Sequence, residues 1–130
     1  MSSIAPDLTR VFIVEDSLAI RERLESMLER IKGVSVAGRA DSPSGAVEGI
    51  LHSRPDSVLL DIQLNGGSGI EVLRKIHPQA PEIVFIVMTN YPNPQYRRIC
   101  MEAGASYFLD KNKDFSRLGE VISSLGEMRH

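Results

Sequence analysis

The most constraining feature of this sequence is an apolar run, residues 58–60, that ends on a carboxylate at Asp61 and leads into a loop with two glycines. Consecutive apolar residues predict a strand that is covered on both faces, as in a parallel sheet. The glycines allow close backbone approach and need no regular structure. Asp61 is therefore expected at the carboxyl end of a buried strand, the edge at which open α/β sheets bind ligands. The simpler interpretation is an aspartate that only caps the next turn.

Strand-like and helix-like patterns alternate along the chain. Short apolar runs predict strands at residues 10–14, 34–40, 57–61, 83–88 and 106–109. Each run is followed by a segment whose apolar residues recur at helical spacing, which predicts an amphipathic helix. Ser17 is the expected N-cap of the first helix and Gly33 its expected stop, and Gly126 is expected to end the last helix.

This alternation determines the fold class. Short connections between alternating strands and helices predict a parallel sheet with right-handed crossovers, covered on both faces. A closed eight-stranded barrel needs about 250 residues, whereas this chain has 130. We therefore predict an α/β, doubly wound, five-stranded parallel sheet of order 2-1-3-4-5, the flavodoxin-like (βα)5 arrangement. Strands 1, 3, 4 and 5 are neighbours in that order, so their carboxyl ends form one rim, with Glu15, Asp16, Asp61, Thr89 and Lys111.

Composition excludes several other classes of protein. The net charge of −2 provides no basic field for phosphates, so we expect no nucleic-acid partner. The longest apolar run, residues 83–88, is far shorter than the ~20 residues that span a bilayer, and residues 1–10 lack a secretory pattern. We expect a cytoplasmic protein with no membrane partner. The single cysteine, Cys100, is expected in the core and excludes an internal disulfide.

The ordered set of rim residues resembles the receiver domain of two-component response regulators, in its stand-alone single-domain form. The resemblance covers nearly the whole chain. Each matching piece is common alone, whereas the complete set in this order is specific. The pieces are residues 12–17 with Arg21, residues 59–62 with Gly69, residues 87–89, and Gly104 and Ala105 with Phe108 and Lys111. The resemblance implies one receiver domain over residues 1–130, with its core at about residues 9–126, and no output domain after the last helix.

The resemblance also implies a magnesium site. Asp16 and Asp61 would be direct ligands, Glu15 would hold a metal-bound water, and the backbone carbonyl of Gln63 would complete the protein's ligands. This fits the chemistry of the residues, because clustered carboxylates repel each other and Mg²⁺ is a hard cation that prefers oxygen.

In such a site Asp61 would be the nucleophile that accepts a phosphoryl group, and Lys111 would neutralise charge in the transition state. Thr89 would donate its hydroxyl to the bound phosphoryl group, and Phe108 would reorient as the switch. The protein would catalyse only its own phosphorylation and dephosphorylation. The donor would be a histidine kinase or a histidine phosphotransfer protein. A downstream protein would contact the fourth helix, fifth strand and fifth helix.

The sequence departs from the family pattern at several of these positions. Glu15 replaces the commoner aspartate, which should move one carboxylate by a methylene. Asn112 replaces the proline that usually follows the lysine, so we expect a trans bond there. Phe108 lacks the hydroxyl of the commoner tyrosine. Asn90 is larger than the usual alanine beside Thr89, and we expect it, with Tyr91, to form a gate on the path to Asp61.

Two other functions remain open at this point. A degenerate receiver would act as a docking module independently of phosphorylation. Two departures favour it, Asn65 at a position where the family usually has a proline and Asn112 after the lysine. The complete set of acids, threonine and lysine opposes it. A flavodoxin-like cofactor binder is disfavoured, because Glu15 and Asp16 would repel a phosphate. The chain is also compatible with a piece of a longer regulator.

Overall fold

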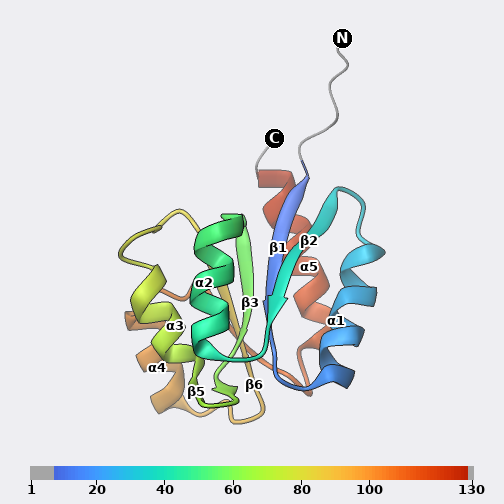
Figure 1. Ribbon diagram of the computed structural model, residues 1–130. Helices are drawn as coiled ribbons and strands as arrows, with labels where there is room; N and C mark the ends of the chain where they lie inside the picture. Colours follow the sequence, from blue (N-terminus) through green and yellow to red (C-terminus); the bar gives the residue numbers. More distant parts are fainter. Residues whose placement is uncertain (1–7, 129–130) are drawn as a thin grey trace.

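The computed structural model describes residues 8–128, in which five parallel strands form one sheet with helices on both faces (Figure 1). The ends of the predicted domain, residues 1–7 and 129–130, lie outside the described residues. The main strands are β1 (Thr9–Val14), β2 (Val34–Ala40), β3 (Ser57–Asp61), β6 (Val84–Thr89) and β7 (Tyr107–Asp110). The helices are α1 (Leu18–Glu29), α2 (Pro43–Ser53), α3 (Gly69–Ile76), α4 (Pro94–Glu102) and α5 (Phe115–Met128).

The sheet has the predicted topology. Its strand order is β2-β1-β3-β6-β7, and every neighbouring pair is parallel. Because β6 and β7 are the fourth and fifth strands of this sheet, the order is the predicted 2-1-3-4-5. The carboxyl ends of all five strands therefore lie at one edge, at the bottom of Figure 1.

Two apolar cores lie on the two faces of the sheet. Side chains alternate along each strand, so that Leu59 packs toward α1 and α5, whereas Leu60 packs toward α2, α3 and α4. Cys100 lies fully buried in the second of these cores, as predicted. Because helices cover both faces of the central strands, a ligand is expected to bind at an edge of the sheet, where the strands end.

Some predicted element ends are wrong, and glycines account for the two that concern helices. Helix α1 ends at Glu29 and not at Gly33, whose φ of +82° places it in the turn that leads into β2. Helix α5 continues through Gly126. A Cβ at Gly126 would lie 3.2 Å from Thr9 Oγ1, so this glycine permits close approach of helix and sheet. Strands β6 and β7 are each shifted by one residue from the prediction.

The loop after Asp61 is more regular than its glycines suggest. Residues Gln63–Leu64 (β4) and Gly67–Ser68 (β5) form a small antiparallel hairpin. Gly66 has a φ of +80° in its turn, a conformation that glycine adopts without strain. Ser68 then caps α3, with its hydroxyl accepting from Ile70 N–H at 3.1 Å. The loop thus leads directly from Asp61 into a helix.

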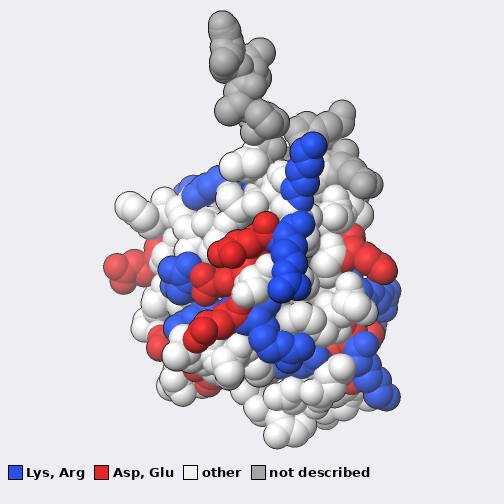
Figure 2. Space-filling model, turned by 90° about the vertical axis from the view of Figure 1, so that its right-hand side faces the viewer, with Lys and Arg blue, Asp and Glu red and all other residues white. Residues whose placement is uncertain are grey.

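The face formed by α1 and β2 carries charges of both signs. Figure 2 shows a column of basic side chains bordered by acidic ones on this side of the molecule. Arg39 and Glu25 form an exposed ion pair there, with Arg39 Nη2 and Glu25 Oε1 2.6 Å apart. Exposed pairs of this kind contribute at most about 1 kcal/mol. Within residues 8–128, no helix combines the length and apolar character needed to cross a membrane.

Gly69 fixes the backbone that carries Asp61, and its replacement provides a test. Its N–H donates to Ile62 O at 2.6 Å, and a Cβ at this position would overlap the backbone carbonyl of Asp61. We expect Gly69→Ala to lower the free energy of unfolding by about 3 kcal/mol, measured by urea denaturation.

Gly119→Ala is the matched control. Its Cβ would meet only Met27 Sδ, at 3.7 Å, inside helix α5. We expect this variant to be more stable than the parent by about 1 kcal/mol, from helix propensity. Equal effects of the two alanines would contradict the assigned role of Gly69.

Candidate functional site

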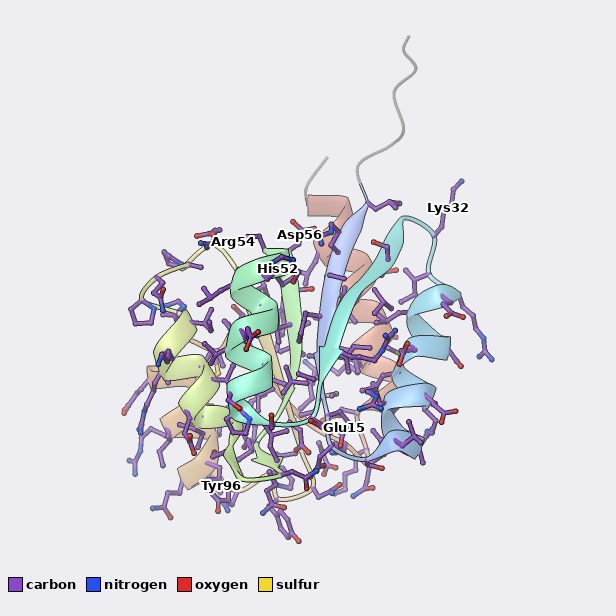
Figure 3. The ribbon with its side chains drawn as sticks, in the orientation of Figure 1. Glu15, Lys32, His52, Arg54, Asp56 and Tyr96 are labelled. Carbon is purple, nitrogen blue, oxygen red and sulfur yellow. The ribbon has the colours of Figure 1, made fainter. Side chains whose placement is uncertain are left out.

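The rim residues predicted from the sequence come together in the structure. Glu15 follows β1, Asp61 ends β3, Thr89 ends β6 and Lys111 follows β7. These strands are consecutive neighbours in the sheet, so their ends meet at one edge. Figure 3 shows Glu15 at this edge, at the opposite end of the molecule from Arg54 and Asp56.

Three carboxylates are crowded at this rim. Oxygen atoms of Glu15, Asp16 and Asp61 all lie within 4.8 Å of one another. Glu15 is 0% exposed and Asp61 is 4% exposed, whereas Asp16 is more open to solvent. Two like charges about 4 Å apart repel by about 4 kcal/mol at an effective dielectric constant near 20. The cluster therefore needs positive charge.

Lys111 supplies one such charge. Its Nζ lies 2.6 Å from Glu15 Oε1 and 3.0 Å from Asp61 Oδ2. The lysine side chain is only 7% exposed, so these ion pairs lie in a region that water screens weakly. Lys111 joins the two most buried acids of the cluster, but one cation balances only part of the charge of three carboxylates.

The pKa values of these groups follow from burial and from the partial balance of charge. Burial raises the pKa of Glu15 and of Asp61 above their ordinary values, and the hydrogen bonds and charge of Lys111 offset this only in part. Burial alone would lower the pKa of Lys111. The hydrogen bond to Glu15 and the charge of Asp61 outweigh that effect, so its pKa is raised. Lys111 thus stays protonated between two carboxylates that resist ionisation.

Thr89 is held at the same rim by two backbone contacts. The residue is 1% exposed, and its Oγ1 accepts a hydrogen bond from Tyr91 N–H at 2.9 Å. Its carbonyl oxygen accepts from Lys111 N–H, also at 2.9 Å, which ties β6 to the residue after β7. Asn90 and Tyr91 are both exposed. The structure therefore places the predicted gate residues on the surface beside Thr89.

The other predicted site residues are Gln63, which contacts the cluster, and Phe108, which lies on the neighbouring strand β7. Gln63 N–H donates to Asp61 Oδ1 at 3.3 Å, so the first residue of β4 contacts the acid directly. Phe108 is half-buried on β7, opposite Val87, and packs against the core under α2, α3 and α4. Its ring is thus placed on the helix α4 side of the last strand.

Sequence reasoning missed Asp110 and Asp114, which shape the loop that carries Lys111. Asp110 Oδ1 accepts from Asn112 N–H at 2.7 Å and from Lys113 N–H at 3.2 Å, and Asp114 Oδ2 accepts from Asp110 N–H at 2.9 Å. Aspartate at the start of a turn is a known signal for this arrangement. Residues 8–128 contain no cis peptide bond, so the Lys111–Asn112 bond is trans, as predicted.

The acidic cluster fits a magnesium ion. All of its candidate donors are carboxylate oxygens, the ligand type that Mg²⁺ prefers. Part of the negative charge of the cluster is not balanced by Lys111, and this is a second property that favours a divalent cation. Nitrogen and sulfur donors are absent from the cluster, which argues against zinc.

The fold and the rim define a class of protein, a doubly wound α/β domain with an acidic, lysine-containing site at the carboxyl edge. The sequence matches the response regulator receiver domain over residues 11–123. The chain therefore belongs to the receiver-domain family of two-component response regulators, as the resemblance predicted.

Several known proteins are similar to it. The sensory transduction protein LytT of Bacillus cereus is 35% identical over 117 residues, covering 88% of this chain and 46% of LytT. The DNA-binding transcriptional activator DevR/DosR of Mycobacterium tuberculosis is 28% identical over 122 residues, or 94% of this chain and 56% of that protein. A CheY-like receiver from Methanospirillum hungatei is 27% identical, with a TM-score of 0.83 and coverage of 93% and 95% of the two chains. The chain spans about half the length of the curated relatives it matches.

Asp61→Asn tests the electrostatic account of the site. The substitution removes one buried charge from the cluster and leaves Glu15 paired with Lys111. We expect the metal-free variant to be more stable than the parent at pH 7, on the order of 1 kcal/mol, or roughly 4 °C in Tm. A lower Tm for the metal-free variant would contradict the account.

The same pair of proteins should differ with pH in a defined direction. Because the folded-state pKa of Asp61 is raised above its ordinary value of 3.8, its favourable contribution is present below that value and is lost as pH rises through the folded pKa. The stability difference between variant and parent should thus be small below the ordinary pKa and grow with pH. Urea unfolding across this range measures it, and a constant difference would contradict the assigned shift.

Proposed function

We propose that this receiver domain accepts a phosphoryl group on Asp61 and uses it as a signal, in a two-component phosphorelay. One observation carries the proposal: Lys111 Nζ lies within 3.0 Å of an Asp61 carboxylate oxygen, in a cluster of three acids. An aspartate that only capped a turn would not need a buried lysine and two further acids beside it. The contact between Lys111 and Asp61 also argues against a degenerate receiver that acts only as a docking module.

The chemical step follows from these groups. A carboxylate oxygen of Asp61 attacks the phosphorus of a phosphohistidine in a histidine kinase or histidine phosphotransfer protein. The P–N bond breaks, the electron pair returns to the imidazole, and Asp61 becomes an acyl phosphate. Lys111 balances negative charge on the phosphoryl oxygens as they leave the donor.

Glu15, Asp16 and Asp61, with the Gln63 carbonyl, are the groups that would hold Mg²⁺. When bound, the ion supplies charge neutralisation for the phosphoryl oxygens. Lys111 and the acids are already packed together at the rim, so the protein's own groups need little rearrangement to position the reaction.

The signal would pass through the rim toward α4, β7 and α5. Thr89 Oγ1 is held by Tyr91 N–H, and its hydroxyl hydrogen can turn toward a phosphoryl oxygen on Asp61. Movement of the chain at Thr89 would change the space beside the half-buried ring of Phe108 on the neighbouring strand. A downstream protein would read this change on the surface of α4, β7 and α5.

Intact-mass spectrometry tests the proposal directly. We expect the protein to gain the mass of one phosphoryl group with acetyl phosphate and Mg²⁺, and to gain nothing as Asp61→Asn. Lys111→Ala should remain folded and lose phosphorylation. Lys113→Ala, an exposed lysine two residues away, is the matched control and should react like the parent. Equal loss in both lysine variants would contradict the role of Lys111, and an unmodified parent would support the docking module.

The proposed gate makes a separate prediction. Asn90 and Tyr91 flank the rim residue Thr89, and an amide at Asn90 narrows the path for a donor and for the water that hydrolyses the acyl phosphate. A displacement of about 1 Å can change such rates on the order of 100-fold. We expect Asn90→Ala to speed both phosphorylation by acetyl phosphate and self-dephosphorylation, by about tenfold each.

Asn112→Ala is the control for this gate, because Asn112 is an exposed asparagine on another loop of the same edge. It should leave both rates unchanged. Unchanged rates in Asn90→Ala would disprove the gate. Slower phosphorylation with faster hydrolysis would show that the amide binds phosphoryl oxygens.

A further inference from the structure

The loop that carries Lys111, residues 110–114, is closely hydrogen-bonded, and we call it the lysine loop. Each of its five backbone N–H groups donates a hydrogen bond. Lys111 N–H donates to Thr89 O at 2.9 Å. The other four bonds all involve Asp110, which donates one of them and accepts three. One residue thus organises most of the backbone of this loop.

Asp110 accepts from each of the three residues that follow Lys111. Its Oδ1 accepts from Asn112 N–H at 2.7 Å and from Lys113 N–H at 3.2 Å. Its backbone oxygen accepts from Asp114 N–H at 2.9 Å. Lys111 is enclosed by these bonds, because they join the residue before it to the residues after it. The backbone of Lys111 is therefore held on both sides.

Asp114 directs its carboxylate to the lysine loop and not to the helix that follows. Asp114 O accepts from Leu118 N–H at 3.0 Å, so this residue is the N-cap of α5. The side chain of an N-cap aspartate ordinarily accepts from an N–H of the first helical turn. Within residues 8–128, the hydrogen bond of the Asp114 carboxylate is to Asp110 N–H, at 2.9 Å. Capping of α5 does not explain this contact, whereas fixation of the lysine loop does.

The position of the loop backbone matters because Lys111 reaches its partners through a long side chain. Its buried Nζ lies 2.6 Å from Glu15 Oε1 and 3.0 Å from Asp61 Oδ2. The four-carbon stem of a lysine is flexible, so it does not determine the position of the ammonium group by itself. The lysine loop also contains no proline that would restrict its backbone. Hydrogen bonds are thus the restraint that remains.

We propose that Asp110 and Asp114 are positioning residues for Lys111. Their hydrogen bonds hold the lysine loop so that the ammonium group lies between Glu15 and Asp61. The ion pairs of Lys111 within the described residues are with those two acids, so Asp110 and Asp114 act on it through the backbone. The effect on phosphorylation rests on the proposed function, whereas the position of Lys111 does not.

Chemical labelling of lysine measures the position of Lys111 without phosphorylation. Acetic anhydride acetylates accessible amines, and peptide mass spectrometry gives the rate at Lys111 relative to Lys75, which is exposed on α3. We expect Asp110→Ala to raise this relative rate about tenfold, the effect of one to two lost hydrogen bonds. Asp110→Asn keeps an oxygen that accepts both N–H groups and should react like the parent. Equal labelling of Lys111 in Asp110→Ala and the parent would overturn the proposal.

Phosphorylation by acetyl phosphate with Mg²⁺ provides a second measurement. Asp110→Ala should lower the maximal rate about tenfold and leave the half-saturating concentration of acetyl phosphate unchanged, because Lys111 acts in the transition state. Asp110→Asn should restore the rate. Asp41→Ala, at an exposed aspartate after β2 on the same edge of the sheet, is the matched control and should behave like the parent.

Two results would assign Asp110 a different role. A lower Tm for Asp110→Ala, with labelling and maximal rate unchanged, would show that the residue only stabilises the fold and would overturn the proposal. Equal losses in Asp110→Ala and Asp110→Asn would show that its charge acts instead of its hydrogen bonds, and would overturn it too.

Asp114→Ala decides the proposal if Asp110→Ala fails to fold. It removes the bond to Asp110 N–H and should raise the labelling of Lys111 about threefold. Unchanged labelling in Asp114→Ala would overturn the proposal. If the parent protein accepts no phosphoryl group, the proposed function is wrong, and the labelling rates alone decide whether Asp110 and Asp114 position Lys111.

Discussion

The contact of Lys111 with Glu15 and Asp61 is the interaction on which the rest of the site depends. It joins residues from the ends of β1, β3 and β7 through one buried ammonium group. Buried charges are tolerated only when paired, and removing one partner leaves the others uncompensated. Hydrogen bonds of the surrounding backbone position the lysine for this contact. Lys111 N–H donates to Thr89 O, and Asp110 accepts from Asn112 N–H in the turn of the loop that carries the lysine. The lysine nevertheless leaves the cluster short of positive charge, and this shortage makes the rim suited to a divalent cation.

Much of the fold could be predicted from the sequence because its patterns are local. Apolar runs and helical spacing give strands and helices in order, and alternation requires a parallel sheet whose strand ends share one edge. The glycines were harder to interpret. Gly126 contributes to close packing of α5 against Thr9, and Gly66 belongs to a hairpin turn. A sequence pattern does not distinguish a glycine that stops a helix from one that lets another side chain approach, since this depends on tertiary neighbours.

The candidate site was predictable in its residue types and order, but not in its contacts. The sequence places Asp61 and Lys111 at neighbouring strand ends, yet it does not give the Asp110 and Asp114 hydrogen bonds that hold the lysine loop without a proline. Strand β3 thus delivers the acid of the candidate site at the end of a fully buried apolar segment.

The most direct test of the account is chemical trapping of the modified residue. Borohydride reduces an acyl phosphate on aspartate to the alcohol of homoserine, with release of phosphate, and peptide sequencing by mass spectrometry then locates the product. After incubation with acetyl phosphate and Mg²⁺, the account predicts homoserine at residue 61 alone and none when Mg²⁺ is replaced by a chelator. Reduction at Asp16 or Glu15, or no reduction at residue 61 in phosphorylated protein, would contradict it.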